Sequence, residues 1–309
     1  MIYAELSGGL GNQMFIYAFA RALGLRCGED VTLLDRADWQ HGAPAHTQCA
    51  LQQLAIDPAV RIVAQPGFAK QHLPRQNAAK SLMIKCEQRG GLMARDWQPF
   101  ERAMAPLLNT LGVHFSTEGY TLVRRGHCQN FLAWGYFQSE RYFADAAAVL
   151  RAELRPAQPV DHPALHAPCP VCVHLRRGDY QNPENAILQV CGPAYYARAA
   201  AQVAARYPQA TLLVFSDDIA WAKAHFDPAG LPVTFMPQGS AVQDLGLMQQ
   251  CRHFILSNST YSWWAQYLGD APDKTVWAPD RWYAHTKRSD LYDARWNLVA
   301  TRQDSTAAR

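Results

Sequence analysis

The stretch His174-Leu175-Arg176-Arg177-Gly178-Asp179-Tyr180 decides how the second half of this sequence is interpreted. It begins inside an apolar run, residues 171–175, which predicts a buried strand with two arginines and a carboxylate at its carboxyl end. In an open α/β sheet, ligands bind outside that end of the strands. Two guanidinium groups there would form an always-charged fork suited to a pyrophosphate. For an isolated Arg-Arg pair, a solvated turn is the alternative interpretation.

Strands and helices alternate through the rest of this half. Each of the first four expected strands is followed by a helical pattern, and Gly269 is a candidate C′ residue for the last helix. Such alternation predicts parallel βαβ units. The expected strands cover residues 171–175, 211–215, 233–236, 254–256 and 275–278, and the expected helices cover about 193–207, 219–226, 244–251 and 260–268.

The first half begins with the same alternation and then becomes less regular. Residues 2–6, 14–25 and 31–34 predict a strand, a helix and a strand that ends at Asp35. No topology can be assigned to residues 41–130. A further strand is expected over 131–137, followed by a helix that Ser139 would cap and that would end near residue 154.

A proline-rich stretch divides the chain. Five prolines between residues 156 and 170 cannot continue a helix or a central strand, so we expect a linker there. The length of 309 residues fits two domains. We therefore expect one Rossmann-like domain over residues 1–155, a linker over 156–170, a second Rossmann-like domain over 171–290, and a C-terminal segment with a polar tail over 291–309. A cleft between the two domains is expected.

Composition and charge exclude several classes of protein. The chain is 49% hydrophobic and 18% charged, which is typical of a globular protein. A net charge of +3 without a basic block argues against a nucleic-acid partner. The first residues do not resemble a signal peptide and no apolar run reaches the length of a membrane span, so a cytoplasmic location is expected. The eight cysteines are then expected to be reduced thiols. Cys169-Pro170-Val171-Cys172 has the spacing of a redox motif, but Cys172 falls inside an expected strand and no helix begins there, so a redox or metal role is not favoured.

The loop Gly9-Leu10-Gly11-Asn12-Gln13-Met14 has three interpretations. It lies between a strand and a helix, where a dinucleotide fingerprint would lie, and Asp35 resembles the acid that binds a ribose. However, Met14 occupies the place of the third glycine, where a bulky side chain would push helix and strand apart. We favour a loop whose Asn12 and Gln13 hydrogen-bond sugar hydroxyls. A structural loop with helix-capping amides is the third interpretation.

Acidic residues follow two further strands. Asp217 and Asp218 end the strand over 211–215, where they could bind a ribose or a metal, or cap the next helix. Asp244 precedes an apolar helical pattern and is also a candidate N-cap. Its functional interpretation is recognition of a guanine base, whose edge presents two donors to one carboxylate.

The stretch Ser257-Asn258-Ser259-Thr260-Tyr261-Ser262 opens a helix that carries Trp263 and Trp264. Hydroxyls and free backbone N–H groups at a helix N-terminus form an anion site, whereas a plain helix cap is the alternative. The tryptophans are expected in the core. The sequence contains no Asp-x-Asp pair of the kind that often holds a metal–nucleotide complex, so we expect no metal and no other cofactor.

These segments together resemble the bacterial family of inverting α-1,2-fucosyltransferases. The matches are ordered and run over most of the chain, and the stretch from about 41 to 130 carries none. The segments that carry the resemblance are Gly8-Gly9-Leu10-Gly11-Asn12-Gln13-Met14-Phe15 with Tyr17-Ala18-Phe19-Ala20, then residues 135–143, 174–180, 215–218, 244–248 and 257–264.

The resemblance implies a GT-B-like pair of domains, with GDP-β-L-fucose on the second and the acceptor reaching in from the first. It implies transfer of fucose, with inversion, to the 2-hydroxyl of a terminal β-galactose, and it is compatible with peripheral association with membrane-linked glycans. By this likeness Arg176 contacts the β-phosphate and Asn12 lies near the reacting centre. The residues implied on the donor side are His174, Arg176, Arg177, Asp217, Asp218, Asp244, Asn258, Ser259, Thr260 and Tyr261, and those on the acceptor side are Asn12 and Gln13.

The group that takes the acceptor proton is left open by the sequence. Asp179 is a candidate base, but a carboxylate beside two arginines can instead orient them. Glu184 is a weaker candidate, and a loose transition state needs no strong base. Arg176, Asp179 and Asn12 are thus the expected catalytic residues. The alternative functions are a dinucleotide-dependent oxidoreductase and a carbohydrate-binding relative without turnover.

Overall fold

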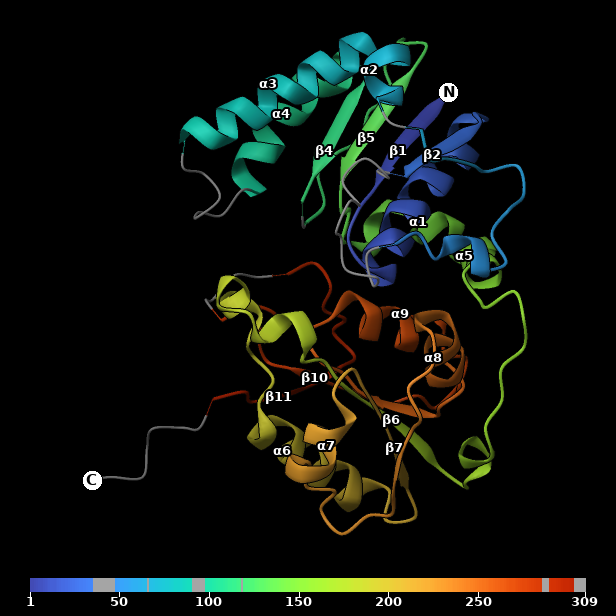
Figure 1. Ribbon diagram of the computed structural model, residues 1–309, viewed down its shortest axis with the longest axis vertical. Coiled ribbons are helices and arrows are strands. Elements are labelled where there is room, and N and C mark those ends of the chain that lie inside the picture. Colours follow the sequence, from blue (N-terminus) through green and yellow to red (C-terminus); the bar gives the residue numbers. More distant parts are fainter. Residues whose placement is uncertain (36–47, 66, 91–97, 118, 285–288, 303–309) are drawn as a thin grey trace. The chain divides into compact units, whose positions relative to one another are not determined.

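The computed structural model describes residues 1–35, 48–65, 67–90, 98–117, 119–284 and 289–302. The chain forms two compact units, Met1–Arg155 and Pro156–Arg309. Each unit contains one β-sheet whose paired strands all run parallel (Figure 1). The prediction of two Rossmann-like α/β domains, as in a GT-B-like fold, is confirmed. The cleft between them stays a prediction.

The first unit has five strands in the order β3-β2-β1-β5-β4. The central strand β1 is buried at all five positions, because helices or loops cover both faces of a parallel sheet. The strands are β1 (Ile2–Leu6), β2 (Val31–Asp35), β3 (Arg61–Val63), β4 (Val113–Ser116) and β5 (Phe131–Gly135). The helices are α1 (Leu10–Cys27), α2 (Phe68–His72), α3 (Pro74–Gly90), α4 (Gln98–Thr110) and α5 (Ala147–Glu153), with short 3-10 turns η3 (Leu51–Gln53), η5 (Glu140–Tyr142) and η6 (Ala144–Ala146).

Helix α1 is the core helix of this unit. Its residues Met14, Phe15 and Phe19 are fully buried, and the Phe19 ring stacks on Phe137 with centroids 4.1 Å apart. The helix begins four residues before the expected start. It ends at Cys27 and is followed by Gly28, whose φ of 64° is the left-handed conformation that glycine adopts without strain. The glycine loop of the sequence is therefore the junction between β1 and α1.

The second unit has six strands in the order β11-β10-β9-β6-β7-β8. Counted from β6, this is the strand order of a doubly wound nucleotide-binding fold, with the topological switch point, where the strand order reverses, between β6 and β9. The strands are β6 (Pro170–Leu175), β7 (Thr211–Ser216), β8 (Val233–Phe235), β9 (His253–Ile255), β10 (Val276–Pro279) and β11 (Asn297–Val299). The helices are α6 (Pro193–Arg206), α7 (Ile219–His225), α8 (Ala241–Met248) and α9 (Thr260–Leu268), with 3-10 turns η7 (Pro163–His166), η8 (Gly178–Gln181) and η9 (Pro183–Leu188).

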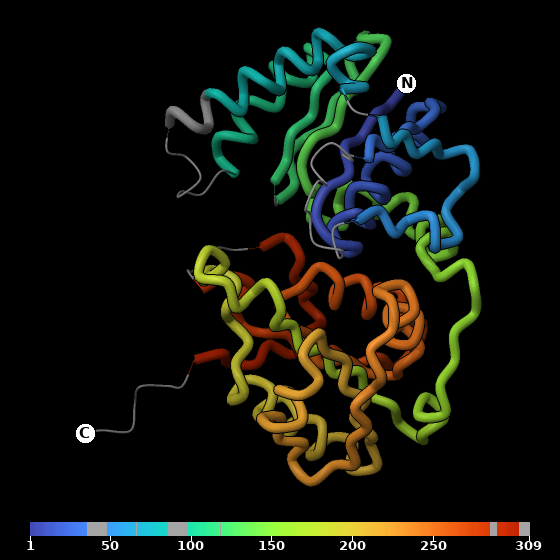
Figure 2. The backbone as a smooth tube through the Cα atoms, viewed as in Figure 1, coloured from blue at the N-terminus to red at the C-terminus, as the bar shows by residue number. Residues whose placement is uncertain are grey.

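Two buried tyrosines of α6 bond to the ends of β6 and β9, the strands on either side of the switch point. The hydroxyl of Tyr196 donates to the His174 carbonyl at 3.2 Å, and that of Tyr195 donates to the Leu256 carbonyl at 2.5 Å. Figure 2 follows the chain from β6 through the short turns η8 and η9 into α6. The N-terminal part of α6 is thus hydrogen-bonded to the edge of the sheet that presents Arg176.

Three local predictions are wrong. Ser139 precedes the 3-10 turn η5 and its side chain makes no capping bond, and the α-helix begins only at Ala147. Helix α8 begins at Ala241 and is capped by Ser240, so Asp244 lies inside the helix. Gly269 has φ −65°, which any residue adopts, and a side chain there would meet the Phe254 ring at 2.8 Å.

The ends of the second unit contain more structure than the sequence indicates. The expected linker, residues 156–170, includes η7 and the first residue of β6. The expected C-terminal segment, residues 291–309, supplies β11, which pairs with β10. The short polar and apolar mixture Asn297-Leu298-Val299 has no strand-like periodicity, which is why this strand is not predicted.

Candidate active site

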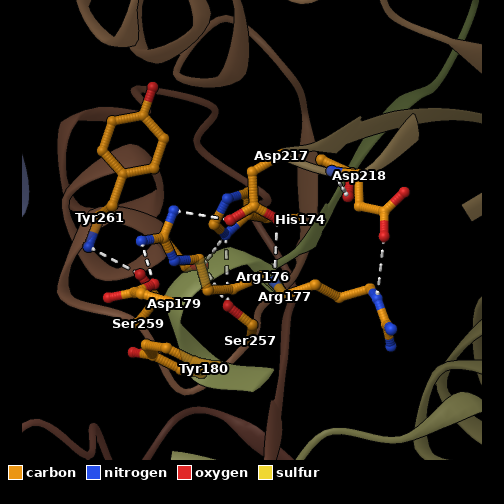
Figure 3. A network of polar contacts seen from close by, with 12 residues as sticks. His174, Arg176, Arg177, Asp179, Tyr180, Asp217, Asp218, Ser257, Ser259 and Tyr261 are labelled. Carbon is orange, nitrogen blue, oxygen red and sulfur yellow. Dashed lines mark hydrogen bonds and ion pairs between the residues drawn. The ribbon is translucent and has the colours of Figure 1, made fainter. Parts of the chain in front are cut away.

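The candidate site lies at the carboxyl edge of the second sheet, where the ends of β6, β7 and β9 adjoin. Leu175 pairs with Ser216 of β7, and Val173 pairs with Ile255 of β9, so the residues that follow these strands leave the sheet together. This edge also includes the topological switch point between β6 and β9, where the strand order reverses, and open α/β sheets bind ligands at such a point. Figure 3 shows the polar side chains gathered there.

Arg176 is held by two carboxylates. Its Nη2 donates to Oδ1 of Asp179 at 2.5 Å, and its Nη1 lies 2.7 Å from Oδ2 of Asp217. Its Cζ is 5.5 Å from the centroid of the Tyr180 ring. The Arg176 side chain is 24% exposed, so a charged guanidinium of fixed orientation is partly open to solvent at the strand edge. The N–H groups of this guanidinium that the carboxylates do not use remain for an anion, while the two carboxylates offset its charge.

Arg177 points away from Arg176 (Figure 3). Its Cζ lies 3.7 Å from the centroid of the Trp221 ring, and its Nε lies 3.4 Å from Oδ2 of Asp218. The expected fork of two guanidinium groups is therefore wrong, because consecutive residues leave the strand end in different directions. The cation–π contact of Arg177 instead fastens this turn to α7.

The two consecutive acids also separate. Asp218 is the N-cap of α7, and its Oδ1 accepts the backbone N–H of Trp221 at 3.0 Å. The capping interpretation is thus confirmed for Asp218. Asp217 accepts the backbone N–H of Arg177 at 2.9 Å and pairs with Arg176 through its other oxygen.

His174 is buried directly behind Arg176. Its Nδ1 lies 2.5 Å from Oγ of Ser262 and 3.3 Å from Oγ of Ser257, and the residue is 6% exposed. Burial, and secondly the charge of Arg176, lower the pKa of His174 to about 3. The imidazole is therefore neutral near pH 7, and its ring lies 5.4 Å from that of Tyr261.

The serine-rich stretch caps α9. Oγ of Ser259 accepts the backbone N–H of Tyr261 at 3.3 Å, so the helix-cap interpretation is confirmed for Ser259, and Thr260 is the first residue of the helix. The amide nitrogen of Asn258 donates to the carbonyls of Leu188 and Trp282, both at 2.9 Å. Asn258 thus fixes the loop, and the N-terminus of α9 adjoins His174.

Asp244 lies in the first turn of α8. Its Oδ1 accepts the backbone N–H of Gly239 at 3.1 Å, and burial raises its pKa above the ordinary value. The hydroxyl of Tyr261 donates to the carbonyl of Ala241 at 2.5 Å, which joins this turn of α8 to α9. Tyr261 therefore links the first turn of α8, which carries Asp244, to the N-terminus of α9 beside His174.

Asn12 and Gln13, the two amide residues of the glycine loop in the first unit, have different surroundings. The Gln13 side chain is 1% exposed, donates to the carbonyls of Gly8 and Gln48, and accepts the N–H of Ala50. These contacts favour the structural interpretation of Gln13. Asn12 is only partly buried, and its Oδ1 accepts from Nε2 of Gln138 at 3.0 Å. Gly8, with φ 71°, leaves room for Asn12, because a Cβ would lie 2.6 Å from its Nδ2.

Several contributing residues were not predicted. Gly178, Trp221 and the tyrosines of α6 support Arg176 or the turn that carries it, and Gln138 contacts Asn12. Gly178 and Gln138 lie inside segments that carry the family resemblance, which was the available signal. Of the candidate bases, Asp179 contacts Arg176, whereas Glu184 is exposed on η9.

Cys172 and Met14, two further residues singled out in the sequence, are both buried. Cys172 is buried in β6 beside Cys251, and burial raises its thiol pKa, which does not favour a reactive thiol. Met14 is fully buried at the position where a dinucleotide loop would have its third glycine. In the described part of the chain, no helix is long and apolar enough to cross a membrane. The described residues also contain no group of three or more His, Cys, Asp or Glu side chains arranged to hold a metal ion.

Comparison with known families identifies the class of protein. The model of "Glycosyl transferase family 11" matches residues 107–300, which include the whole second sheet. The chain belongs to this family. It is therefore a glycosyltransferase, as the resemblance implied.

The chain is also similar to three curated proteins. The chain is similar to the O-antigen biosynthesis glycosyltransferase WbnK of Escherichia coli, at 27% identity over 96% of this chain and 99% of the relative. It is similar to an alpha-1,2-colitosyltransferase of Escherichia coli, at 26% identity over 92% of each chain. It is also similar to human galactoside alpha-(1,2)-fucosyltransferase 1, at 29% identity over 57% of this chain and 48% of the relative.

Proposed function

We propose that this family 11 glycosyltransferase transfers L-fucose from GDP-β-L-fucose to the 2-hydroxyl of a terminal β-galactose, with inversion, to give an α-1,2 linkage. The observation that carries the proposal is Arg176 at the carboxyl edge of β6, next to the N-terminus of α9. The names of the relatives support an α-1,2 linkage and a 6-deoxy- or dideoxyhexose donor. The bacterial relative named for O-antigen biosynthesis supports a surface-glycan acceptor.

On the donor side, Arg176 would contact the β-phosphate. The bond between C1 of fucose and the β-phosphate oxygen breaks, so negative charge grows on GDP while positive charge grows on the sugar ring. A preorganised guanidinium stabilises this departing charge more strongly in the transition state than in the ground state. Backbone N–H groups at the start of α9 would add to it.

The base would be recognised by Asp244, with neutral His174 beside the nucleoside. The guanine N1–H and N2–H₂ are two donors that suit one ionised carboxylate. Since burial raises the pKa of Asp244, these two donors would favour its charged form on binding. Because His174 remains uncharged, it would not compete with Arg176 for the diphosphate.

On the acceptor side, Asn12 would lie near the reacting centre. The attacking 2-hydroxyl oxygen forms the new bond to C1 and loses its proton. Oδ1 of Asp179 is engaged by Arg176, and within the described part of the chain its Oδ2 makes no hydrogen bond or ion pair. This oxygen is the candidate acceptor for the proton. If Asp179 only orients Arg176, a loose transition state delivers the proton to solvent or to the leaving phosphate.

We propose that no metal takes part, because the sequence lacks Asp-x-Asp and Arg176 supplies positive charge to the diphosphate. We further propose a cytoplasmic enzyme that can meet membrane-linked acceptors at the surface of the bilayer.

The decisive assay supplies lactose with GDP-fucose, GDP-colitose or UDP-galactose and identifies the product by NMR. Colitose is included because the alpha-1,2-colitosyltransferase matches over 92% of this chain. We expect a single product from GDP-fucose with the α anomer on O2 of galactose. A product only from GDP-colitose would change the donor, and a β linkage would contradict inversion.

Thermal unfolding with nucleotides separates the remaining alternatives. We expect GDP to raise the melting temperature and NAD to leave it unchanged, because a ligand at 100 times its Kd stabilises by about 2.7 kcal/mol. A shift with NAD and none with GDP would favour the oxidoreductase. GDP binding without transfer to any β-galactoside would favour a non-catalytic relative.

A further inference from the structure

Asp217 occupies an unusual position between two consecutive arginines. Oδ1 accepts the backbone N–H of Arg177 at 2.9 Å, and Oδ2 lies 2.7 Å from Nη1 of Arg176. Oδ1 is thus used in a hydrogen bond, and Oδ2 is buried against Arg176 in an ion pair that does not have the geometry of a hydrogen bond. The Asp217 side chain is 22% exposed, so it is set between the strand ends of β6 and β7 and does not extend freely into solvent.

Gly178 makes this position possible. A Cβ on Gly178 would lie 2.6 Å from Oδ2 of Asp217 and 3.4 Å from its Cγ. The first of these distances is shorter than any normal contact, so a side chain at residue 178 would displace the carboxylate that holds Arg176. The φ of Gly178 lies outside the left-handed region, so backbone conformation does not require glycine here. Space for Asp217 does.

We propose that Asp217 and Gly178 form a clamp that positions Arg176 for the diphosphate, and that Asp217 itself touches neither the ribose nor a metal. This inference rests on the proposed function, because it assigns a role relative to the donor. Arg176 has a long side chain with several rotatable bonds, and fixing it before binding removes an ordering cost from the donor complex. The clamp differs from Asp179, whose carboxylate is 32% exposed and holds the other nitrogen, Nη2.

The sharpest variant leaves every charged group in place. Gly178→Ala adds one methyl group and should move the Asp217 carboxylate away from Arg176. We expect transfer of fucose to lactose to fall about ten- to hundredfold, the scale on which a misplacement of about 1 Å acts. The KM for lactose should stay unchanged, because the clamp lies on the donor side. Asp217→Asn should produce the same split between kcat and the acceptor KM.

Gly192→Ala is the matched control. Gly192 precedes α6, has φ −90°, and nothing lies within 4 Å of a Cβ built on it. The same glycine-to-alanine change should there leave kcat and GDP affinity within about twofold, as expected of a surface change without a contact.

A double-mutant cycle tests whether the clamp acts through Arg176. In an Arg176→Lys background, Gly178→Ala should have little further effect, because a lysine cannot span both carboxylates. Nitrogen-15 NMR of the arginine side chains provides a readout without turnover: the slow rotation of the Arg176 guanidinium in the wild type should become fast in Gly178→Ala and Asp217→Asn.

The outcomes separate this inference from the proposed function. Normal kcat and normal Arg176 signals in Gly178→Ala, in a wild type that transfers fucose, would overturn the clamp and leave the function standing. Independent, multiplicative losses in the double mutant would also overturn it. A wild type that binds GDP more tightly than Gly178→Ala but transfers no fucose would support the clamp and contradict the function. A wild type that binds no GDP would contradict both.

Discussion

The guanidinium of Arg177 lies over the ring of Trp221, with its Cζ 3.7 Å from the ring centroid, while Arg176 turns toward Asp179 and Asp217. The two arginines of one motif therefore have different tasks. One fastens the strand-end turn to α7, and the other is presented at the edge of the sheet where the donor is proposed to bind.

This division predicts unequal effects of two otherwise similar substitutions. Arg176→Ala should lower turnover about a hundredfold or more, the effect of removing one preorganised donor to a developing anion. Arg176→Lys should also be poor, because an ammonium cannot reproduce the planar fork. Arg177→Ala should mainly lower the free energy of unfolding, by about 1 kcal/mol. Equal losses of kcat in Arg176→Ala and Arg177→Ala would contradict the division.

Asn12 should affect transfer more than donor binding. It is partly buried, it contacts Gln138, and it belongs to the first unit. We expect Asn12→Ala to reduce transfer to lactose severely and to change GDP affinity by less than about threefold, a difference below 1 kcal/mol. Gln13→Ala is the contrasting variant, because its buried amide holds the loop and its loss should lower stability. A collapse of GDP affinity in Asn12→Ala, with normal saturation by lactose, would show that the first loop is wrongly assigned.

Turnover should persist in excess EDTA. The charge of the leaving diphosphate is proposed to be offset by Arg176 and the start of α9, so removal of divalent ions should leave kcat unchanged. The assay is initial-rate transfer with and without chelator. Activity that disappears with EDTA and returns with manganese or magnesium would overturn the metal-independent account.

Stability should fall in mild acid through His174. Its pKa is lowered to about 3 in the folded protein, mainly by burial, and is about 6.5 in an unfolded chain. Between these values the unfolded state binds one more proton, so the free energy of unfolding decreases as pH falls below about 6.5. His114, whose pKa burial also lowers to about 3, adds to this effect.

The measurement is urea unfolding of the wild type and His174→Gln at pH 7 and pH 5. Each unit of pH below 6.5 corresponds to about 1.4 kcal/mol per histidine, so the wild type should lose about 2 kcal/mol more than the variant. Parallel pH dependence in the two proteins would mean that His174 titrates alike in both states.

The fold could be predicted where burial makes the sequence pattern simple. Strands β1, β6 and β7 are mostly apolar and almost completely buried, and α9 follows a serine cap, so their bounds agree closely with the expectation. Strand β4 was missed because His114 and Ser116 are polar, yet both are fully buried. Their hydrogen bonds to Asn109 and Gly119 satisfy them, and a pattern of apolar residues does not indicate that polar side chains are buried with partners.

The candidate site was predictable as a set of residues and less so as a geometry. Arg176, Asp179, His174 and Ser259 lie together because parallel strands end at one edge. The direction of Arg177 depends on its own backbone angles, φ −131° and ψ −77°, which depart from a regular strand and which no periodicity encodes. The start of α8 was misjudged because the capping box formed by Ser240 and Gln243 lies before the apolar pattern.

The most direct test of this account is a crystal structure of the protein with bound GDP. The account predicts the β-phosphate within hydrogen-bonding distance of the Arg176 guanidinium and the guanine N1 and N2 within that distance of the Asp244 carboxylate. It also predicts that Asp217 keeps its contacts to Arg176 and to the backbone of Arg177. GDP bound at the loop from Gly8 to Gln13, or a diphosphate held through a metal without Arg176, would contradict it.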